Sequence, residues 1–106
     1  MGLFNPAESN EHPAVAHLLN SRTLARKFKP DRHVDVDGNV DFPALLSDCH
    51  SSTERILALA AWQLSDGGGE NEMGPELSEL VIRLDDEQFE ALIEAMRLRR
   101  QVPASP

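Results

Sequence analysis

The run ILALAAW, at positions 56–62, places the strongest constraint on how this chain folds. Its residues are apolar on nearly every side of a helix, and such a helix is stable only when other elements cover it all round. Ser51 and Glu54 precede the run with the spacing of a capping box, in which each side chain accepts a hydrogen bond from the other residue's backbone N–H. The sequence therefore predicts a helix that begins after Ser51 and lies at the centre of the core.

Prolines and apolar spacing predict further helices on both sides of this central one. Pro13 suits the first position of a helix, and apolar side chains recur at helical spacing over residues 15–28. We expect Pro30 to end that helix, because the residue before a proline is pushed out of the helical region. Pro43 and Pro75 each stand at the start of another short apolar segment, which predicts a short helix after each.

The last helix is predicted to begin after Asp85, whose side chain suits an N-cap. We expect an apolar stripe of this helix to face the core. Its residues, at helical spacing, are Phe89, Leu92, Ile93 and Met96, and Ala91, Ala95 and Leu98 widen it. Acidic residues fill the first turn and arginines close the last one, which is the favourable arrangement for a helix dipole.

The stretch HVDVDGNVDF breaks the helical period and alternates apolar with polar residues, which predicts a β-hairpin. A three-residue loop pairs Val36 with Val40 and Val34 with Phe42, so that all four apolar side chains share one face. Asn39 is then the loop residue that takes the left-handed conformation. The sequence predicts this register rather than a two-residue loop.

The acidic residues of the same stretch suggest a calcium loop. An EF-hand with Gly38 at its sixth position has His33 at its first and Ala44 at its twelfth, where carboxylate ligands are needed, so a high-affinity EF-hand is excluded. Asp35 and Asp41 would face each other across the predicted strands, which is unfavourable for like charges. We expect nearby cationic side chains to relieve this repulsion, and relief by a weakly bound cation is the alternative.

Together these elements predict a mainly α-helical fold, a compact bundle of about four to five helices with a small β-hairpin inserted after the first helix. Residues 12–101 are expected to form a single helical domain, which is what a chain of 106 residues allows. We expect a mobile N-terminus at residues 1–11, a flexible glycine-rich loop at 65–74 and a disordered tail at 102–106.

The charge and the apolar runs exclude several classes of protein. A formal net charge of −8 makes nucleic acid an unlikely partner, because neutralising phosphates requires a surplus of Lys and Arg. No apolar run approaches the roughly 20 residues that cross a membrane, and the first residues do not resemble a signal peptide. The single cysteine, Cys49, cannot form an internal disulfide. We therefore expect a cytoplasmic protein with no membrane contact.

No group of residues has the spacing of a catalytic, cofactor-binding or metal-binding motif. His12 and His17 are five residues apart, which does not place them on one helical face. Cys49, with His50 or His33 as its base, is a candidate nucleophile, but a buried structural cysteine is far commoner. The last two helices are not predicted to form a DNA-binding helix-turn-helix motif, because the second helix would present carboxylates to the phosphates. We expect no catalytic residue, no metal and no cofactor, and hence no enzyme.

Two charged segments are the candidate partner-binding surfaces. The predicted binding residues are Arg22, Arg26, Lys29 and Arg32 of a basic run, and Asp86, Glu87 and Glu90 at the start of the last helix. The basic run pairs either with acidic helices of this chain or of a second copy, or with an acidic surface of another protein. Nucleic acid is the least favoured of these partners.

Three segments, VDFPALL, SSTERILALAAWQLSDGGG and LDDEQFEALIEAMRLRR, resemble those of a set of small uncharacterised bacterial and phage helical proteins. The resemblance spans about residues 40–100. It implies a central helix that carries a tryptophan, a glycine loop, a closing helix that begins with Leu-Asp-Asp, and a bacterial or phage setting. It implies no active site.

The favoured function is that of a small acidic non-enzymatic protein-binding module, an adaptor or regulatory subunit, whose partner is another protein or a second copy of itself. One alternative is an acidic inhibitor that mimics nucleic acid and acts on a nucleic-acid-processing enzyme. A second alternative is a weak metal-binding or cysteine-dependent enzyme.

Overall fold

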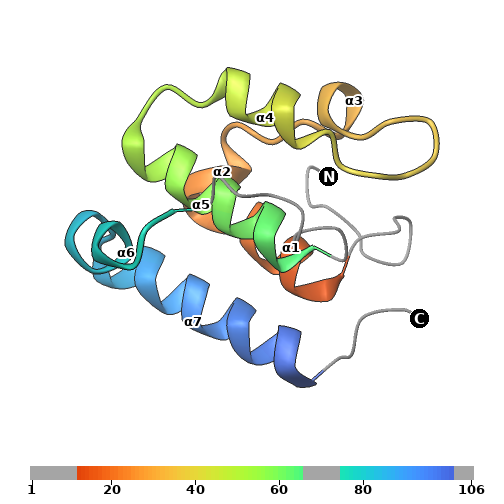
Figure 1. Ribbon diagram of the computed structural model, residues 1–106. Helices are drawn as coiled ribbons and strands as arrows, with labels where there is room; N and C mark the ends of the chain where they lie inside the picture. Colours follow the sequence, from red (N-terminus) through yellow and green to blue (C-terminus); the bar gives the residue numbers. More distant parts are fainter. Residues whose placement is uncertain (1–11, 66–74, 102–106) are drawn as a thin grey trace.

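The computed structural model describes residues 12–65 and 75–101 and places seven helices within these two ranges (Figure 1). They are α1 (Pro13–Leu19), α2 (Arg22–Ala25), α3 (Pro30–His33), α4 (Phe42–Asp48), α5 (Ser52–Leu64), α6 (Leu77–Arg83) and α7 (Asp86–Gln101). No β-strand occurs in the described residues. The predicted mobile N-terminus, disordered tail and nearly all of the predicted glycine loop lie outside them. The mainly helical class is confirmed, with more helices than the four to five predicted.

Helix α5 lies at the centre of the fold, between α4 and α7 (Figure 1), and it also contacts α1, α2 and α6. It begins with the predicted capping box: the N–H of Glu54 donates to the Ser51 hydroxyl at 3.2 Å, and the N–H of Ser51 donates to the Glu54 carboxylate at 3.1 Å. The side chains of Leu57, Ala58 and Ala61 are completely buried. The prediction of a helix at the centre of the core is confirmed, although Arg55 and Gln63 of α5 are exposed.

The N-terminal segment forms three short helices where one long helix was predicted. Residue Ser21 adopts an extended backbone and starts α2, and its hydroxyl donates to the carbonyl of Leu18, so the chain bends between α1 and α2. The bend lets both helices contribute to the core, since α1 and α2 each contact α5. Pro30 does not end a helix: it is the first residue of α3, a position that needs no backbone N–H.

The predicted β-hairpin is wrong. A single antiparallel bridge joins Val34 to Val40, in place of the expected Val36–Val40 pairing, and it closes a five-residue loop. The carboxylate of Asp35 accepts hydrogen bonds from two backbone N–H groups inside that loop, at 2.9 and 3.0 Å, and so stabilises a turn that the apolar pattern did not indicate. Gly38, not Asn39, takes the positive φ, and the side chain of Val36 is fully exposed.

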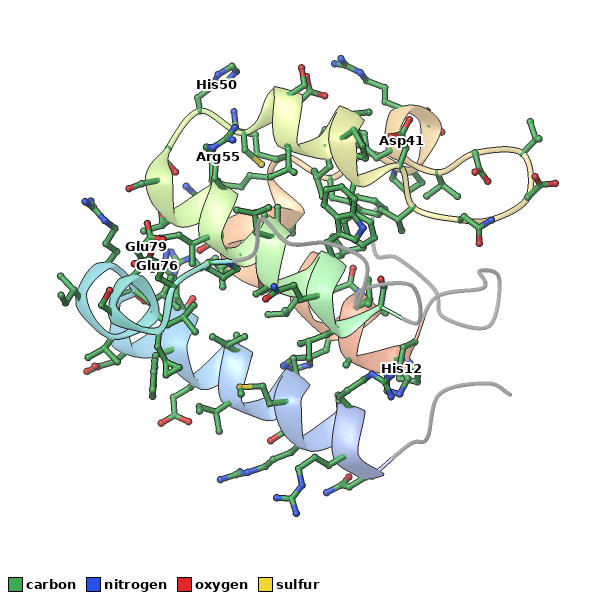
Figure 2. All side chains as sticks on the ribbon, viewed as in Figure 1. His12, Asp41, His50, Arg55, Glu76 and Glu79 are labelled. Carbon is green, nitrogen blue, oxygen red and sulfur yellow. The ribbon has the colours of Figure 1, made fainter. Side chains whose placement is uncertain are left out.

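Helix α4 begins at Phe42, the residue with which the predicted strand was expected to end. Asp41 caps the helix by accepting from the N–H of Ala44 at 3.2 Å, at the start of α4 in Figure 2. The ring of Phe42 stacks on Trp62 of α5, with the ring centroids 5.5 Å apart. Trp62 is partly buried and packs against the core, so the tryptophan ties α4 to α5.

Helices α6 and α7 are each started by a capping box. Glu76 and Glu79 form the first and lie together at the start of α6 (Figure 2). In the second, the Asp85 carboxylate accepts from the N–H of Gln88 at 2.8 Å and the Gln88 amide oxygen accepts from the N–H of Asp85 at 3.0 Å. The predicted cap at Asp85 is therefore confirmed. Helix α6 has no buried side chain and exposes three large apolar ones, Leu77, Val81 and Ile82.

The inner side of α7 differs from the predicted stripe. Leu92 and Ala95 are buried on the side that contacts α1 and α5, whereas Phe89 is 36% exposed and Met96 is 45% exposed. The band of apolar residues on this helix is wide, and only one of its edges is buried against α1. The other edge faces outward.

This orientation of α7 can be tested by truncating one buried and one exposed residue of its apolar band. Leu92→Ala should lower the free energy of unfolding by about 2–5 kcal/mol, because it leaves a cavity in the core. The matched variant Met96→Ala, one turn away, should lower it by less than about 1 kcal/mol. Denaturant unfolding followed by circular dichroism measures both, and equal losses would contradict the orientation described.

Candidate functional site

The predicted basic run forms an exposed surface over α2, α3 and the turn between them. Four of its cationic side chains line one shallow depression of about 200 Å³, together with Asp48 and His50. We call this set the basic face; its residues are Arg26, Lys27, Lys29 and Arg32. Phe28, in the middle of the run, is only 3% exposed and belongs to the core. The face therefore carries cations without an exposed aromatic ring at that position.

A hydrogen bond between buried His33 and partly buried Asp48 holds the basic face in place. His33 is completely buried; its Nδ1 accepts from the backbone N–H of Lys29 at 2.9 Å, and its Nε2 lies 2.6 Å from an oxygen of Asp48. Because Nδ1 accepts, Nε2 is the nitrogen that donates to the carboxylate. The ring of Phe28 stacks on His33 at 5.8 Å. These contacts join α3 to the end of α4 and fix the backbone from which Lys29 projects.

The four residues of the basic face differ in how far their charge is already neutralised. Arg32 pairs with Asp48 at 3.2 Å. Arg26, Lys27 and Lys29 form no ion pair with any residue that the structure describes. Three adjacent cations therefore remain available on a chain whose net charge is −8.

Arg22, the remaining predicted basic residue, turns toward α7 instead. Its guanidinium lies 3.6 Å from the carboxylate of Glu87, and the Gln88 amide donates to the Thr23 hydroxyl at 2.9 Å. These contacts join α2 to the first turn of α7 beside a polar depression of about 320 Å³. Arg22 and Glu87 thus pair within one chain, as one of the interpretations of the basic run expected.

The other predicted acidic residues do not join this contact. Asp86 and Glu90 are exposed on α7, beside Phe89 and Ile93. The structure therefore does not bring the seven predicted binding residues into one site. Arg26 borders both the depression of the basic face and the one beside Arg22 and Glu87, whereas neither depression is lined by Asp86 or Glu90.

Cys49 and the histidines are not arranged as a nucleophile and base. The thiol is 5% exposed, and burial raises the pKa of Cys49 to about 11, so it is protonated near neutral pH. His50 points away from the body of the protein at the turn between α4 and α5 (Figure 2). Both ring nitrogens of His33 are already engaged. The thiol therefore does not have the lowered pKa that a nucleophilic cysteine requires.

The acidic residues around Gly38 have structural partners. Asp35 holds its own loop and Asp41 caps α4, so the two carboxylates do not oppose each other across strands. Among residues 12–65 and 75–101, no group of three or more His, Cys, Asp and Glu side chains is placed to hold a metal ion. Sequence reasoning also missed the His33–Asp48 pair, because nothing in the spacing of these two residues indicates that they meet.

Comparisons with protein-family models, curated proteins and solved structures give no match for this chain. Of the helices in the described part of the chain, none is long and apolar enough to span a membrane. The geometry of the site therefore carries the functional argument alone.

The pH dependence of stability tests the buried pair. The hydrogen bond from His33 is the main cause that holds the pKa of Asp48 below its ordinary value. A carboxyl group with a lowered folded-state pKa contributes stability above its unfolded-state pKa of about 4, and that contribution is lost as the pH falls through the folded-state value. Asp48→Asn should therefore be less stable than the wild type at pH 7 and should lose less stability below pH 4.

Asp31→Asn is the matched control, because Asp31 is an exposed carboxylate on the same short helix, α3. It should follow the wild-type profile. Urea unfolding at a series of pH values measures all three proteins. If Asp48→Asn and the wild type lost stability in parallel below pH 4, the His33–Asp48 contact would not be the source of the effect.

Proposed function

We propose that this chain is a non-enzymatic protein-binding module, an adaptor or regulatory subunit, which holds an acidic segment of a partner protein on the basic face. The observation that supports this most directly is the cluster of Arg26, Lys27 and Lys29 without ion-pair partners among the described residues. Cations gathered around a depression attract carboxylates and favour encounter with an acidic surface.

The scaffold beneath these cations supports a binding role because it is fixed before any partner arrives. The backbone N–H of Lys29 is held by buried His33, and Arg32 is held by Asp48. A site whose backbone is already ordered loses less conformational entropy on binding. Arg32 is therefore held in position by Asp48, and Arg26 and Lys29 are the residues that contact the acidic segment of the partner.

A protein segment is a better partner for this face than nucleic acid. A chain with a net charge of −8 repels a polyanion at long range, and the face offers few cations to offset that repulsion. Single-stranded nucleic acid is usually held by stacking on exposed aromatic rings, whereas Phe28 is buried here. A short segment rich in Asp and Glu carries less charge and needs no stacking surface.

The acidic-inhibitor alternative has less support. A nucleic-acid mimic presents a long row of carboxylates, whereas the row on α7 consists of only Asp86, Glu90 and Glu94 and is followed by Arg97, which pairs with Glu94. The enzymatic alternative has little support as well, because the Cys49 thiol is buried with its pKa raised to about 11.

Binding of a fluorescein-labelled decaglutamate peptide, measured by fluorescence anisotropy, tests the proposal. Arg26→Glu and Lys29→Glu should each weaken binding by about fivefold to tenfold, since each loses an attraction and adds a repulsion. Arg83→Glu, an exposed residue on α6 with the same change of net charge, should alter binding by less than about twofold. Binding of the wild type should also weaken as salt is raised from about 50 to 300 mM.

Two results would contradict the proposal. Equal weakening by Arg83→Glu would mean that the peptide responds only to overall charge and not to the basic face. Tighter binding of a single-stranded 20-nucleotide DNA than of the acidic peptide would assign the face to nucleic acid instead.

A further inference from the structure

An apolar row on α7 borders the side of the helix that contacts α1 and α5 and is partly exposed. Phe89 and Met96 are 36% and 45% exposed, and half-buried Ile93 lies between them. The three positions are four and three residues apart, so they share one face of the helix. Rows with this spacing are the usual contact surface for a second amphipathic helix.

Charged side chains of opposite sign flank the two ends of this row. Asp86 and Glu90 lie beside its N-terminal half, and Arg97 and Arg100 lie beside its C-terminal half; all four are exposed. The two arginines line the same shallow depression of about 240 Å³. Asp86 and Arg100 are each seven residues from Ile93, which is two helical turns and keeps them on the same face. Asp86 and Arg100 are therefore symmetrical in position about Ile93 and opposite in charge, and Phe89 with Met96 and Glu90 with Arg97 are symmetrical to within one residue.

From this arrangement we propose that α7 pairs antiparallel with α7 of a second copy of this chain, across a two-fold axis at Ile93. Ile93 then meets the partner's Ile93, and Phe89 packs on the partner's Met96. Asp86 faces the partner's Arg100, and Glu90 faces the partner's Arg97. A two-fold interface uses the same patch on both chains, so each of the unlike contacts forms twice.

The charge pattern favours a second copy of this chain as the partner and an antiparallel orientation of the two helices. In an antiparallel pair the face is its own complement, so a second copy places opposite charges against Asp86, Glu90 and Arg100, and against Arg97 in addition to its own ion pair with Glu94 at 3.7 Å. A parallel pair would set Asp86 against the partner's Asp86 and Arg100 against the partner's Arg100, and like charges at neighbouring helical positions repel. Long, flexible Met96 suits such a contact because its thioether adapts to the shape of a partner.

The interface is small, and it is separate from the basic face. One helix face per chain is below the size of most stable interfaces, so the dimer should be weak and reversible. In Figure 1, α3 and α4 lie on one side of α5 and α7 lies on the other. Dimerisation leaves the basic face open, and either proposal can fail while the other stands.

Sedimentation equilibrium of the full chain, from about 10 µM to 1 mM, tests the pairing over the range in which weak interfaces form. The wild type should change reversibly from 11.7 kDa toward twice that mass as concentration rises. Ile93→Glu should stay monomeric throughout, because it places like charges at the two-fold axis. Thermal unfolding by circular dichroism shows whether that variant keeps its fold, and Arg83→Glu on α6 should dimerise as the wild type does.

Charge reversal then tests the antiparallel direction. Asp86→Arg alone and Arg100→Asp alone should each weaken dimerisation by about tenfold, since each replaces an attraction by a repulsion at both ends of the interface. The double variant with both reversals should recover wild-type dimerisation, because the charges face each other again. A role of these residues only in the stability of α7 would not produce recovery in dimer mass.

Three results would overturn the proposal: a wild type that remains monomeric at 1 mM, an Ile93→Glu variant that dimerises, or a double charge reversal that fails to recover dimerisation while folded. The first would mean that the apolar row binds a helix of another protein rather than a second copy of this chain. The second and third would place the dimer contact on another surface of the chain.

Discussion

Burial of α5 is the constraint on which the other features of this structure depend. The helix is apolar in nearly every direction, so it is stable only if neighbours remove it from water on several sides. Five other helices contact it. Its fully buried positions include Ala58 and Ala61, and small side chains at such positions let neighbouring helices approach closely. The bend at Ser21 and the stacking of Phe42 on Trp62 serve the same packing, because they bring α2 and α4 against α5.

Covering α5 also determines which side chains are left outside. Helix α7 turns Leu92 and Ala95 inward, which leaves its apolar row and flanking charges on the outer side. The segment of α2 and α3 turns Leu24 and Phe28 inward, which leaves a group of cations exposed. Both proposed binding surfaces are thus the outer sides of elements whose inner sides complete the core. Neither surface requires a bond-making residue, which agrees with the protein-binding role proposed for the chain.

Features that depend on neighbouring residues could be predicted from the sequence, and features that depend on distant residues could not. The helix starts at Ser51 and Asp85 rest on side chains three residues away, and both were predicted correctly. The orientation of α7 depends on α1, so periodicity alone identified its apolar band without showing which edge faces the core. The hairpin failed because the carboxylate of Asp35 stabilises a longer turn than apolar pairing suggests. Arg26, Lys29 and Arg32 of the basic face were predicted as binding residues and Lys27 was not, and the pairing of Arg22 with Glu87 depends on where α7 lies.

Amide hydrogen exchange resolved by residue is the most direct measurement of whether burial of α5 holds this fold together. Amides from Leu57 to Ala61 should exchange only when the whole domain unfolds, with an exchange free energy equal to that of global unfolding. Amides of α6, which has no buried side chain, should exchange through local opening at a distinctly lower free energy. If the amides of α5 exchanged as readily as those of α6, the central helix would not be the element on which the structure depends.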